Sequence, residues 1–222
     1  MIRVFFLVFF VLVTCTSVSQ APALAQTYHD HHHSFQGAEQ WAKEFDDPKR
    51  DEWQKPHQVI QALALKPDAI VADIGSGTGY FAVRFAHMVP KGKVYGVDIE
   101  SDMVKYLDRR AKGMGLTNLI SLQGTPDDPR LPERVDLILI VDTFHHIDNR
   151  HVYLNKLHNY LKPDGLIAVI DYRMETVDGP PKSARSTPDQ MKAELKTSGY
   201  TFVKEYNFLP RQYFLVFGQA TK

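Results

Sequence analysis

Three glycines at alternate positions follow an apolar segment that ends in an aspartate. Residues 71–79 read VADIGSGTG, and glycine suits a backbone that must adopt a positive φ or approach a ligand closely. A nicotinamide fingerprint has the spacing G-x-G-x-x-G/A, but Tyr80 stands where that motif needs a small residue, and no lysine marks a phosphate loop. Asp73 would repel a pyrophosphate but can attract a cationic amine. The loop therefore predicts a cationic small-molecule ligand over a dinucleotide.

The elements that must position this loop alternate between strands and helices. Apolar runs predict strands at residues 69–73, 94–98, 118–122, 135–140 and 166–171, with helices at 59–65, 81–88, 102–112, 149–161 and 188–198. The helix at 149–161 is expected to end at a Lys-Pro-Asp-Gly turn. Two β-rich runs, 201–206 and 212–218, are close enough to form an antiparallel pair. This order predicts a doubly wound α/β sheet that binds its ligand at the carboxyl ends of the strands.

A carboxylate also ends the second predicted strand, at Asp98, and the combined pattern resembles the class I S-adenosylmethionine-dependent methyltransferases from about Val59 to the C-terminus. The resemblance implies a Rossmann-like, three-layer αβα fold with a seven-stranded sheet whose last pair is antiparallel. It implies that S-adenosylmethionine is the cofactor and that Asp98 accepts both ribose hydroxyls, as a bidentate carboxylate can. The residues expected to cradle the methionine portion are Asp73, Gly75, Ser76, Gly77 and Gly79.

The same resemblance assigns less distinctive residues to the cofactor. Ile99 should lie against the adenine, Met103 should line the ribose side, and Asp127 should meet the adenine amino group. Thr125 departs from the family pattern, in which an acid often follows the glycine at this place. Ile99 and Met103 could instead be core residues, and Asp127 a turn residue.

The acceptor side centres on residues 141–147, VDTFHHI, at the end of the fourth strand. Because the donor already carries the activation, alignment of the acceptor can supply much of the catalysis. A base is needed when a hydroxyl or protonated amine must lose its proton, and His145 or His146 could serve. The alternative is that both histidines support the turn. Asp142 could meet the methionine amine or the acceptor, or shape the turn.

A proline-rich loop at residues 178–188 is of the kind that often selects the acceptor in this fold. Arg185 could bind an anionic substrate there, or it could be a solvated loop residue.

The N-terminus has the parts of a secretory signal. Arg3 precedes the apolar run 4–13, and small residues lead to Ala25. We expect residues 1–25 to be a cleaved signal peptide and the protein to be periplasmic or secreted; an uncleaved membrane anchor is the alternative. Cys15 is the only cysteine of the chain, so cleavage would exclude disulfides and thiol catalysis from the mature protein.

Residues 26–58 form a histidine-rich segment and a helical cap before the methyltransferase domain at 59–222. Weak metal-binding candidates are His29, His31, His32 and His33, and an exposed polar terminus is the alternative. Trp41, Phe45 and Trp53 have the spacing of one face of short helices. The stretch WAKEFDDPKRDEWQKP at 41–56 resembles the lead-in of a group of exported or membrane-associated bacterial methyltransferase-like proteins.

The sequence therefore predicts a methyltransferase of a small-molecule acceptor, with an O-linked acceptor slightly favoured. A formal net charge of +0 and a pI near 7.2 make a nucleic-acid partner unexpected. The alternative is an exported, non-catalytic ligand- or metal-binding protein on the same fold, because the methyl donor is made in the cytosol. A nicotinamide oxidoreductase is a third reading. The acceptor and the oligomeric state stay open.

Overall fold

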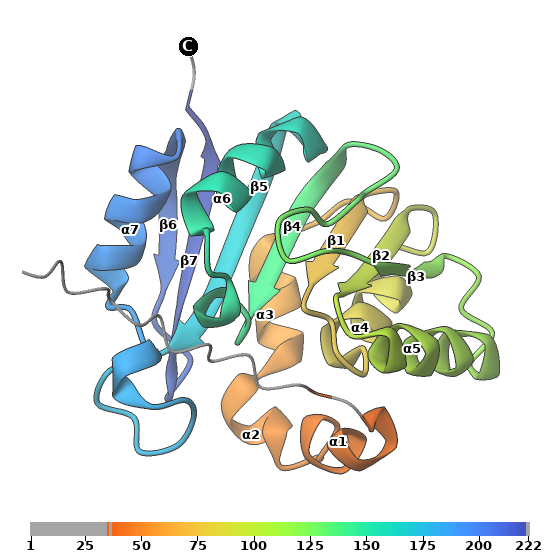
Figure 1. Cartoon of the computed structure of the whole chain (residues 1–222). Helices are drawn as coiled ribbons and strands as arrows, with labels where there is room; N and C mark the ends of the chain where they lie inside the picture. Colours follow the sequence, from red (N-terminus) through yellow and green to blue (C-terminus); the bar gives the residue numbers. More distant parts are fainter. Residues whose placement is uncertain (1–34, 36, 221–222) are drawn as a thin grey trace, which may run out of the picture. The chain divides into compact units, whose positions relative to one another are not determined.

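The computed structural model describes residue 35 and residues 37–220. The expected signal peptide, 1–25, and the candidate metal ligands His29, His31, His32 and His33 lie outside the described residues. The described part contains one seven-stranded sheet with the order β3-β2-β1-β4-β5-β7-β6 (Figure 1). Strands β1 to β5 pair in parallel, and β7 runs antiparallel to both β5 and β6. The predicted doubly wound sheet with an antiparallel last pair is confirmed.

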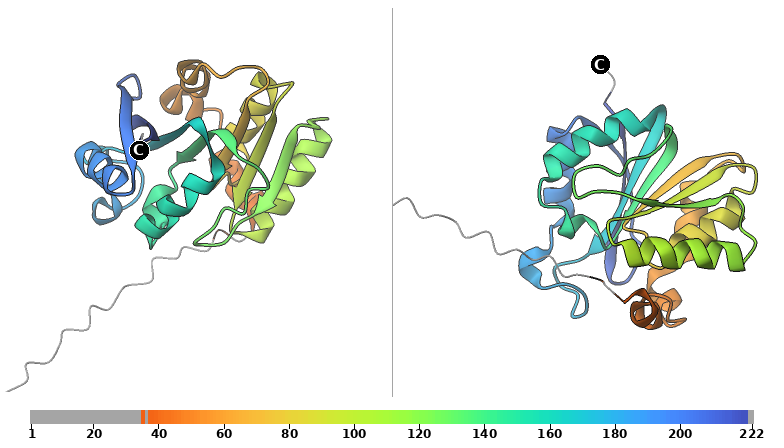
Figure 2. Two further views of the ribbon diagram at one scale, coloured as in Figure 1. Left: turned by 90° about the horizontal axis from the view of Figure 1, so that it is seen from above. Right: turned by 45° about the vertical axis from the view of Figure 1, so that its right-hand side comes forward.

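Helices cover both faces of the sheet (Figure 2). Core residues of α3, α4 and α5 pack on one face, and those of α6 and α7 pack on the other, so the three-layer prediction is also confirmed. The strands are β1 Ile70–Ile74, β2 Lys93–Asp98, β3 Leu119–Gln123, β4 Val135–Val141, β5 Leu161–Tyr172, β6 Tyr200–Tyr206 and β7 Gln212–Gln219. The α-helices are α1 Ala38–Phe45, α2 Arg50–Gln54, α3 Pro56–Leu63, α4 Tyr80–Met88, α5 Ser101–Gly113, α6 Arg150–Leu157 and α7 Pro188–Thr197.

Local sequence explains several of these boundaries. Consecutive residues Leu137 to Ile140 of β4 are fully buried, as expected for a central strand covered on both faces. Helix α4 begins after Gly79, which has the left-handed conformation. Helix α7 begins with a capping box between Thr187 and Gln190 and has proline at its first turn.

The predicted turn at residues 162–165 is wrong. Helix α6 ends at Leu157, and β5 begins at Leu161 and runs through the Lys-Pro-Asp-Gly segment. Val135 pairs with Leu161 and Leu137 with Leu166, so the pairing register shifts between them. The extra residues form an irregularity near the start of the strand, where a proline is tolerated because its missing N–H breaks no central ladder.

Helices α1 and α2 lie beneath the carboxyl ends of the parallel strands (Figure 1) and belong to the same compact unit as the sheet, His32–Lys222. Their aromatic residues do not share one face, contrary to the sequence prediction. Trp41 stacks on Phe45 with ring centroids 5.4 Å apart, whereas Trp53 lies against Tyr172 at 6.0 Å. The helical path breaks after Phe45, before Pro48, and this break turns Trp53 toward another strand end.

Candidate functional site

The glycine loop has a backbone that only glycine adopts easily. Gly75, Gly77 and Gly79 have φ values of 70°, 53° and 92°. A Cβ added at Gly75 would lie 2.2 Å from Thr143 Oγ1, and one at Gly79 would lie 2.3 Å from Leu107 Cδ1. At Gly77 the nearest atom is Cδ2 of Phe45, at 3.3 Å. The first and third glycines thus serve close packing, while Gly77 faces the cap.

Asp98 joins this loop to the end of β2. The Gly77 N–H donates to Asp98 Oδ2 at 2.8 Å, and the Glu100 N–H donates to Oδ1 at 3.0 Å. The Gly75 and Ser76 N–H groups donate to the Val97 carbonyl at 2.8 and 3.0 Å. Burial raises the pKa of Asp98 above its ordinary value, although backbone hydrogen bonds oppose the shift. Each carboxylate oxygen keeps capacity for a further hydrogen bond.

The predicted adenine and ribose residues occupy different environments. Ile99 is 46% exposed beside Asp98, and the turn at residues 124–128 is tied to β2 because the Gly124 N–H donates to the Asp98 carbonyl at 3.0 Å. Asp127 is exposed in this turn and accepts a hydrogen bond from Thr125 Oγ1 at 2.8 Å. Met103 is only 1% exposed and packs in the core. The contacts of Ile99, Asp127 and Met103 with the cofactor stay predictions.

Buried polar groups surround the loop. Asp73 is 3% exposed, and burial raises its pKa to about 7, against a backbone hydrogen bond at Ala82 and the charge of Arg50. Among the described residues, the hydroxyls of Ser76 and Thr78 are buried without a hydrogen-bond partner. Buried hydroxyls in a native protein usually have a hydrogen-bond partner, so these two groups are unusual. The residues present fit an adenosyl ligand with an amino-acid end.

The end of β4 carries the second group of polar side chains. Asp142 has a φ of 53°, accepts a hydrogen bond from Gln212 Nε2 and lies 3.7 Å from Arg50 Nη2. Burial raises the pKa of Asp142 to about 7; Arg50 lowers it and Asp171 raises it further. The Asp142 side chain therefore contacts Arg50 of the cap and Gln212 of β7, and its backbone forms part of the turn after β4.

His145 and Asp171 form a buried pair next to Asp142. His145 Nδ1 lies 3.2 Å from both carboxylate oxygens of Asp171, and the two side chains are 7% and 4% exposed. His146 packs against the ring of His145 at 4.2 Å and against Phe35 at 5.6 Å. The structure brings both predicted histidines to this edge, and His145 faces the carboxylate of Asp171.

Sequence reasoning missed Asp171, Gln54 and Gln212. Asp171 had a signal, because it is an acid at the end of an apolar predicted strand, like Asp73 and Asp98. Gln54 and Gln212 had none: Gln54 Nε2 donates to Gln212 Oε1 at 2.6 Å across 158 positions of sequence, and both residues are fully buried.

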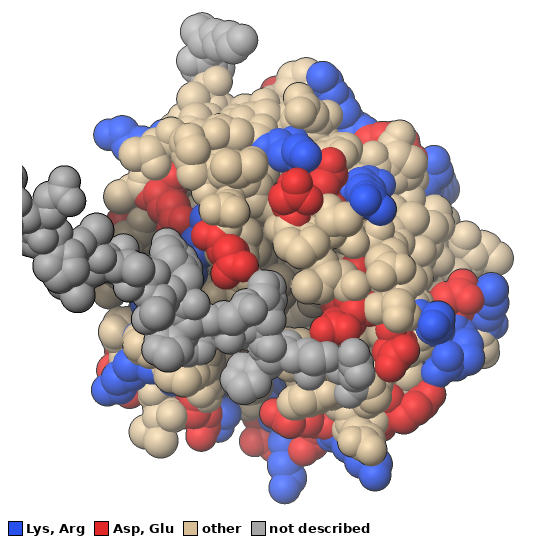
Figure 3. Space-filling view, viewed as in Figure 1, with Lys and Arg blue, Asp and Glu red and all other residues tan. Residues whose placement is uncertain are grey.

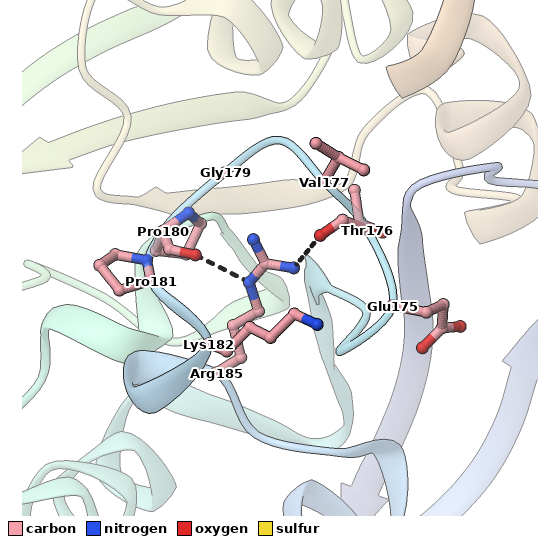
Figure 4. Close-up of a pocket in the computed structure, with 8 residues that line it drawn as sticks. All are labelled: Glu175, Thr176, Val177, Gly179, Pro180, Pro181, Lys182 and Arg185. Atoms are coloured by element: carbon pink, nitrogen blue, oxygen red, sulfur yellow. Dashed lines mark hydrogen bonds between the residues drawn. The ribbon is translucent and has the colours of Figure 1, made fainter.

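Arg185 does not extend toward an anionic substrate. Its guanidinium donates to the carbonyls of Arg173, Thr176, Asp178 and Pro180 at 2.6–2.8 Å, and the residue is 8% exposed. Figure 4 shows the Arg185 side chain within the curve of this loop, where it lines a pocket together with Thr176 and Pro180. Arg185 thus holds the proline-rich loop in shape, because it satisfies carbonyls that have no strand partner.

A seven-stranded sheet of this topology, a glycine loop after its first strand and a carboxylate after its second define the Rossmann-like S-adenosylmethionine-dependent methyltransferases. The chain belongs to the methyltransferase-domain family, whose model matches residues 65–207. Family and fold together support S-adenosylmethionine as the cofactor.

A solved structure and curated relatives agree with this family. The structure of a SAM-dependent methyltransferase from Aquifex aeolicus is 27% identical, with a TM-score of 0.75, over 80% of this chain and 96% of that chain. A demethylmenaquinone methyltransferase of Geobacillus stearothermophilus is 25% identical over 129 residues, 57% of this chain and 54% of that protein. An (S)-coclaurine N-methyltransferase of Papaver somniferum is 29% identical over 126 residues, 54% of this chain and 36% of that protein. The matches thus span about half or less of these curated relatives.

Proposed function

We propose that this protein transfers a methyl group from S-adenosylmethionine to a small-molecule acceptor. The observation that carries the proposal is the glycine loop. Its Gly77 N–H donates to the Asp98 carboxylate at 2.8 Å, and Phe45, the last residue of the cap helix α1, lies against Gly77. The family match supports it. The acceptors in the names of the relatives, demethylmenaquinone and coclaurine, are small molecules.

The residues of the chain divide the work between binding and proton handling. S-adenosylmethionine supplies a methyl group activated by its sulfonium. Asp98 and the loop backbone bind and orient, and the ring of Phe45 excludes water from the Gly77 side of the loop. The charge pattern suits such a ligand: on the face drawn in Figure 3, acidic and basic side chains are interspersed without a broad basic area.

His145 is the proposed base for the acceptor, and Asp171 is its positioning residue. Because Asp171 faces Nδ1 at 3.2 Å, Nε2 is left as the nitrogen that can take a proton from an acceptor hydroxyl. Burial of the pair keeps water from competing for that proton. This arrangement supports a slight preference for an O-linked acceptor, since a hydroxyl must lose its proton.

The test has two stages and begins without an acceptor. Calorimetric titration of the full chain with S-adenosylhomocysteine should give micromolar-range binding, roughly −8 kcal/mol, and Asp98→Ala should abolish it. Labelled methyl transfer into a small-molecule extract should then yield a labelled product that depends on His145. A folded wild type that binds no cofactor refutes the proposal. Binding without transfer into any extract favours a non-catalytic binding protein.

We also propose that residues 1–25 are a signal peptide and that the mature protein works outside the cytosol, a location that would require a donor supply there. The apolar run 4–13 and the small residues before Ala25 support this. Within residue 35 and residues 37–220 no helix has the length and hydropathy to cross a membrane. N-terminal sequencing of the fractionated protein tests the proposal: a chain that starts at Gln26 supports cleavage, and one that keeps residue 1 in the membrane fraction supports an anchor.

The non-catalytic alternative has a metal-binding form that depends on the histidine-rich segment. In the described part of the chain, no group of three or more histidine, cysteine or acidic residues is placed to hold a metal ion. A zinc titration should separate the two readings: affinity above that of a bare histidine peptide supports the metal-binding form.

A further inference from the structure

Arg50 reaches from the cap into the carboxylate-rich edge of the sheet. It is the first residue of α2, and its guanidinium stacks on the ring of Tyr80 at 4.0 Å. Nε donates to Gln54 Oε1 at 3.0 Å and Nη1 donates to the Phe45 carbonyl at 2.9 Å. The side chain is 15% exposed. These contacts fix the guanidinium plane and orient its remaining edge.

One nitrogen of the Arg50 guanidinium, Nη2, has N–H donors available for a ligand. Among the described residues, Nη2 of Arg50 makes no hydrogen bond; its nearest charged partner is Asp142 Oδ2, at 3.7 Å. The charge of Arg50 also acts on Asp73, whose pKa it lowers against the effect of burial. An arginine edge in this position can form a bidentate pair with a carboxylate that enters the site.

The neighbouring arginine differs in this respect. Arg84 stacks on Tyr80 at the same distance, 4.0 Å, but its Nη2 donates to both oxygens of Asp51 at 2.9 and 3.2 Å, and its Nη1 donates to the Tyr80 carbonyl. Arg84 therefore ties the cap to α4, and both of its terminal nitrogens already donate hydrogen bonds. The two arginines share one aromatic ring and differ in whether a ligand can use them.

The order of the strands indicates which part of the cofactor meets Arg50. Strands β3, β2, β1 and β4 are adjacent in that order, so the 124–128 turn, Asp98, the glycine loop and Asp142 follow one another along the edge. An elongated ligand with its adenine beside Ile99 and its ribose on Asp98 places its amino-acid end beyond the glycine loop, near Asp142. Arg50 lies there, beside two carboxylates that would repel the ligand's own carboxylate.

We propose that Arg50 binds the carboxylate of the methionine portion of S-adenosylmethionine through its Nη2 edge. The inference rests on the proposed function and adds a cofactor residue from outside the glycine motif. Asp142 and Asp73 then face the cationic amine and sulfonium, while Arg50 faces the one anionic group of the ligand. The cap thereby takes part in cofactor binding as well as covering the site.

The test compares two ligands that differ in this carboxylate. The full chain, wild type and Arg50→Met, is titrated calorimetrically with S-adenosylmethionine and with decarboxylated S-adenosylmethionine. We expect Arg50→Met to weaken S-adenosylmethionine binding roughly 10- to 100-fold, the loss of a charge-assisted pair, and to change the decarboxylated ligand less than about twofold. Arg50→Lys should fall between, because a point charge replaces a bidentate edge. Arg84→Met is the matched control and should weaken both ligands equally or neither.

The outcomes separate this inference from the proposed function. Equal losses for both ligands in Arg50→Met would show that Arg50 only holds the cap in place, and unchanged affinities would place the cofactor's carboxylate elsewhere. Either result overturns the inference while the cofactor assignment stands. A folded wild type that binds neither ligand overturns the cofactor assignment and this inference with it. If Arg50→Met does not fold, the same ligand comparison on Arg50→Lys decides.

Discussion

The two halves of the carboxyl edge are built in different ways. The cofactor half, after β1 and β2, is held by backbone groups: the Gly75 and Ser76 N–H groups bond to the Val97 carbonyl, and the Gly77 N–H bonds to Asp98. The acceptor half, at the ends of β4 and β5 and the start of β7, is held by side chains from remote segments, such as Gln54 with Gln212.

This difference determines how each half can vary. A backbone cradle depends on φ values that few residues other than glycine adopt, so substitutions there act on the whole loop. A side-chain network can be rebuilt with other polar residues as long as each buried group keeps a partner. We therefore expect the side-chain network to tolerate substitutions that the glycine loop does not.

The largest expected effect on cofactor binding lies where the halves touch, at Gly75. Gly75→Val would place a Cβ 2.2 Å from Thr143 Oγ1 at a φ of 70°, so we expect S-adenosylhomocysteine binding to fall more than roughly 100-fold and thermal stability to drop. Calorimetry and a melting curve measure both. Gly113→Ala, where no atom lies within 4 Å of an added Cβ, is the control. Unchanged binding by Gly75→Val would show that the halves are not coupled here.

The acceptor half is tested alone by His145→Gln and Asp171→Asn. We expect the methyl-transfer rate to fall roughly 10²- to 10⁴-fold for His145→Gln and less for Asp171→Asn, since the base is lost in one and misoriented in the other. Cofactor affinity should stay within about twofold, because neither residue belongs to the backbone cradle. His146→Gln should have a smaller effect. A matching loss of affinity would mean that the pair belongs to the cofactor half.

The cofactor half is tested alone by Asp98→Asn and Asp127→Asn. We expect Asp98→Asn to weaken S-adenosylhomocysteine binding roughly 10- to 100-fold, because a charge-assisted acceptor for two hydroxyls and for the Gly77 N–H is lost. Asp127→Asn should cost about twofold to fivefold if Asp127 meets the adenine. No change in Asp127→Asn would make it a turn residue, as its bond with Thr125 allows.

A smaller effect should appear with pH and involves both halves. Asp73 and Asp142 have pKa values raised to about 7, chiefly by burial, so they are largely neutral below pH 7 and negative above it. Affinity for cationic S-adenosylmethionine should therefore rise, about threefold to tenfold between pH 6 and 8, while that for uncharged methylthioadenosine should stay level. Asp142→Asn should reduce the rise, and a level profile for both ligands would show that neither carboxylate faces the cation.

The raised pKa values of Asp73 and Asp142 also determine the direction in which stability changes with pH. A carboxyl whose folded pKa is above its unfolded value binds its proton more tightly in the folded state, so its contribution to the free energy of unfolding declines as pH rises from about 4 to about 7. Asp142→Asn should therefore flatten the pH dependence of the melting temperature in this window. A variant with the wild-type slope would contradict the raised pKa.

The fold and the cofactor half could be derived from the sequence because their causes are local. Apolar runs predict strands that are buried on both faces of the sheet. Glycines at 75, 77 and 79 indicate the positive φ values that the loop adopts. Asp98 ends the next predicted strand along the chain, and the pairing of adjacent parallel strands brings their carboxyl ends together, so its place beside the glycine loop was also within reach of motif reasoning. The turn predicted at residues 162–165 was wrong because the pairing of β5 with β4 outweighed the turn preference of this segment.

The side-chain contacts at the edge of the sheet were decided by tertiary packing. The sequence does not show which partners Arg50 and Arg84 have; their roles differ because Asp51 lies against Arg84 and Asp142 lies near Arg50. Arg185 similarly changed from a candidate substrate ligand to a loop support, because four backbone carbonyls surround it. Backbone conformation restricts residue type position by position, and a sequence displays that restriction directly. Side-chain partners depend on which remote segments the sheet brings together, and only the folded chain displays them.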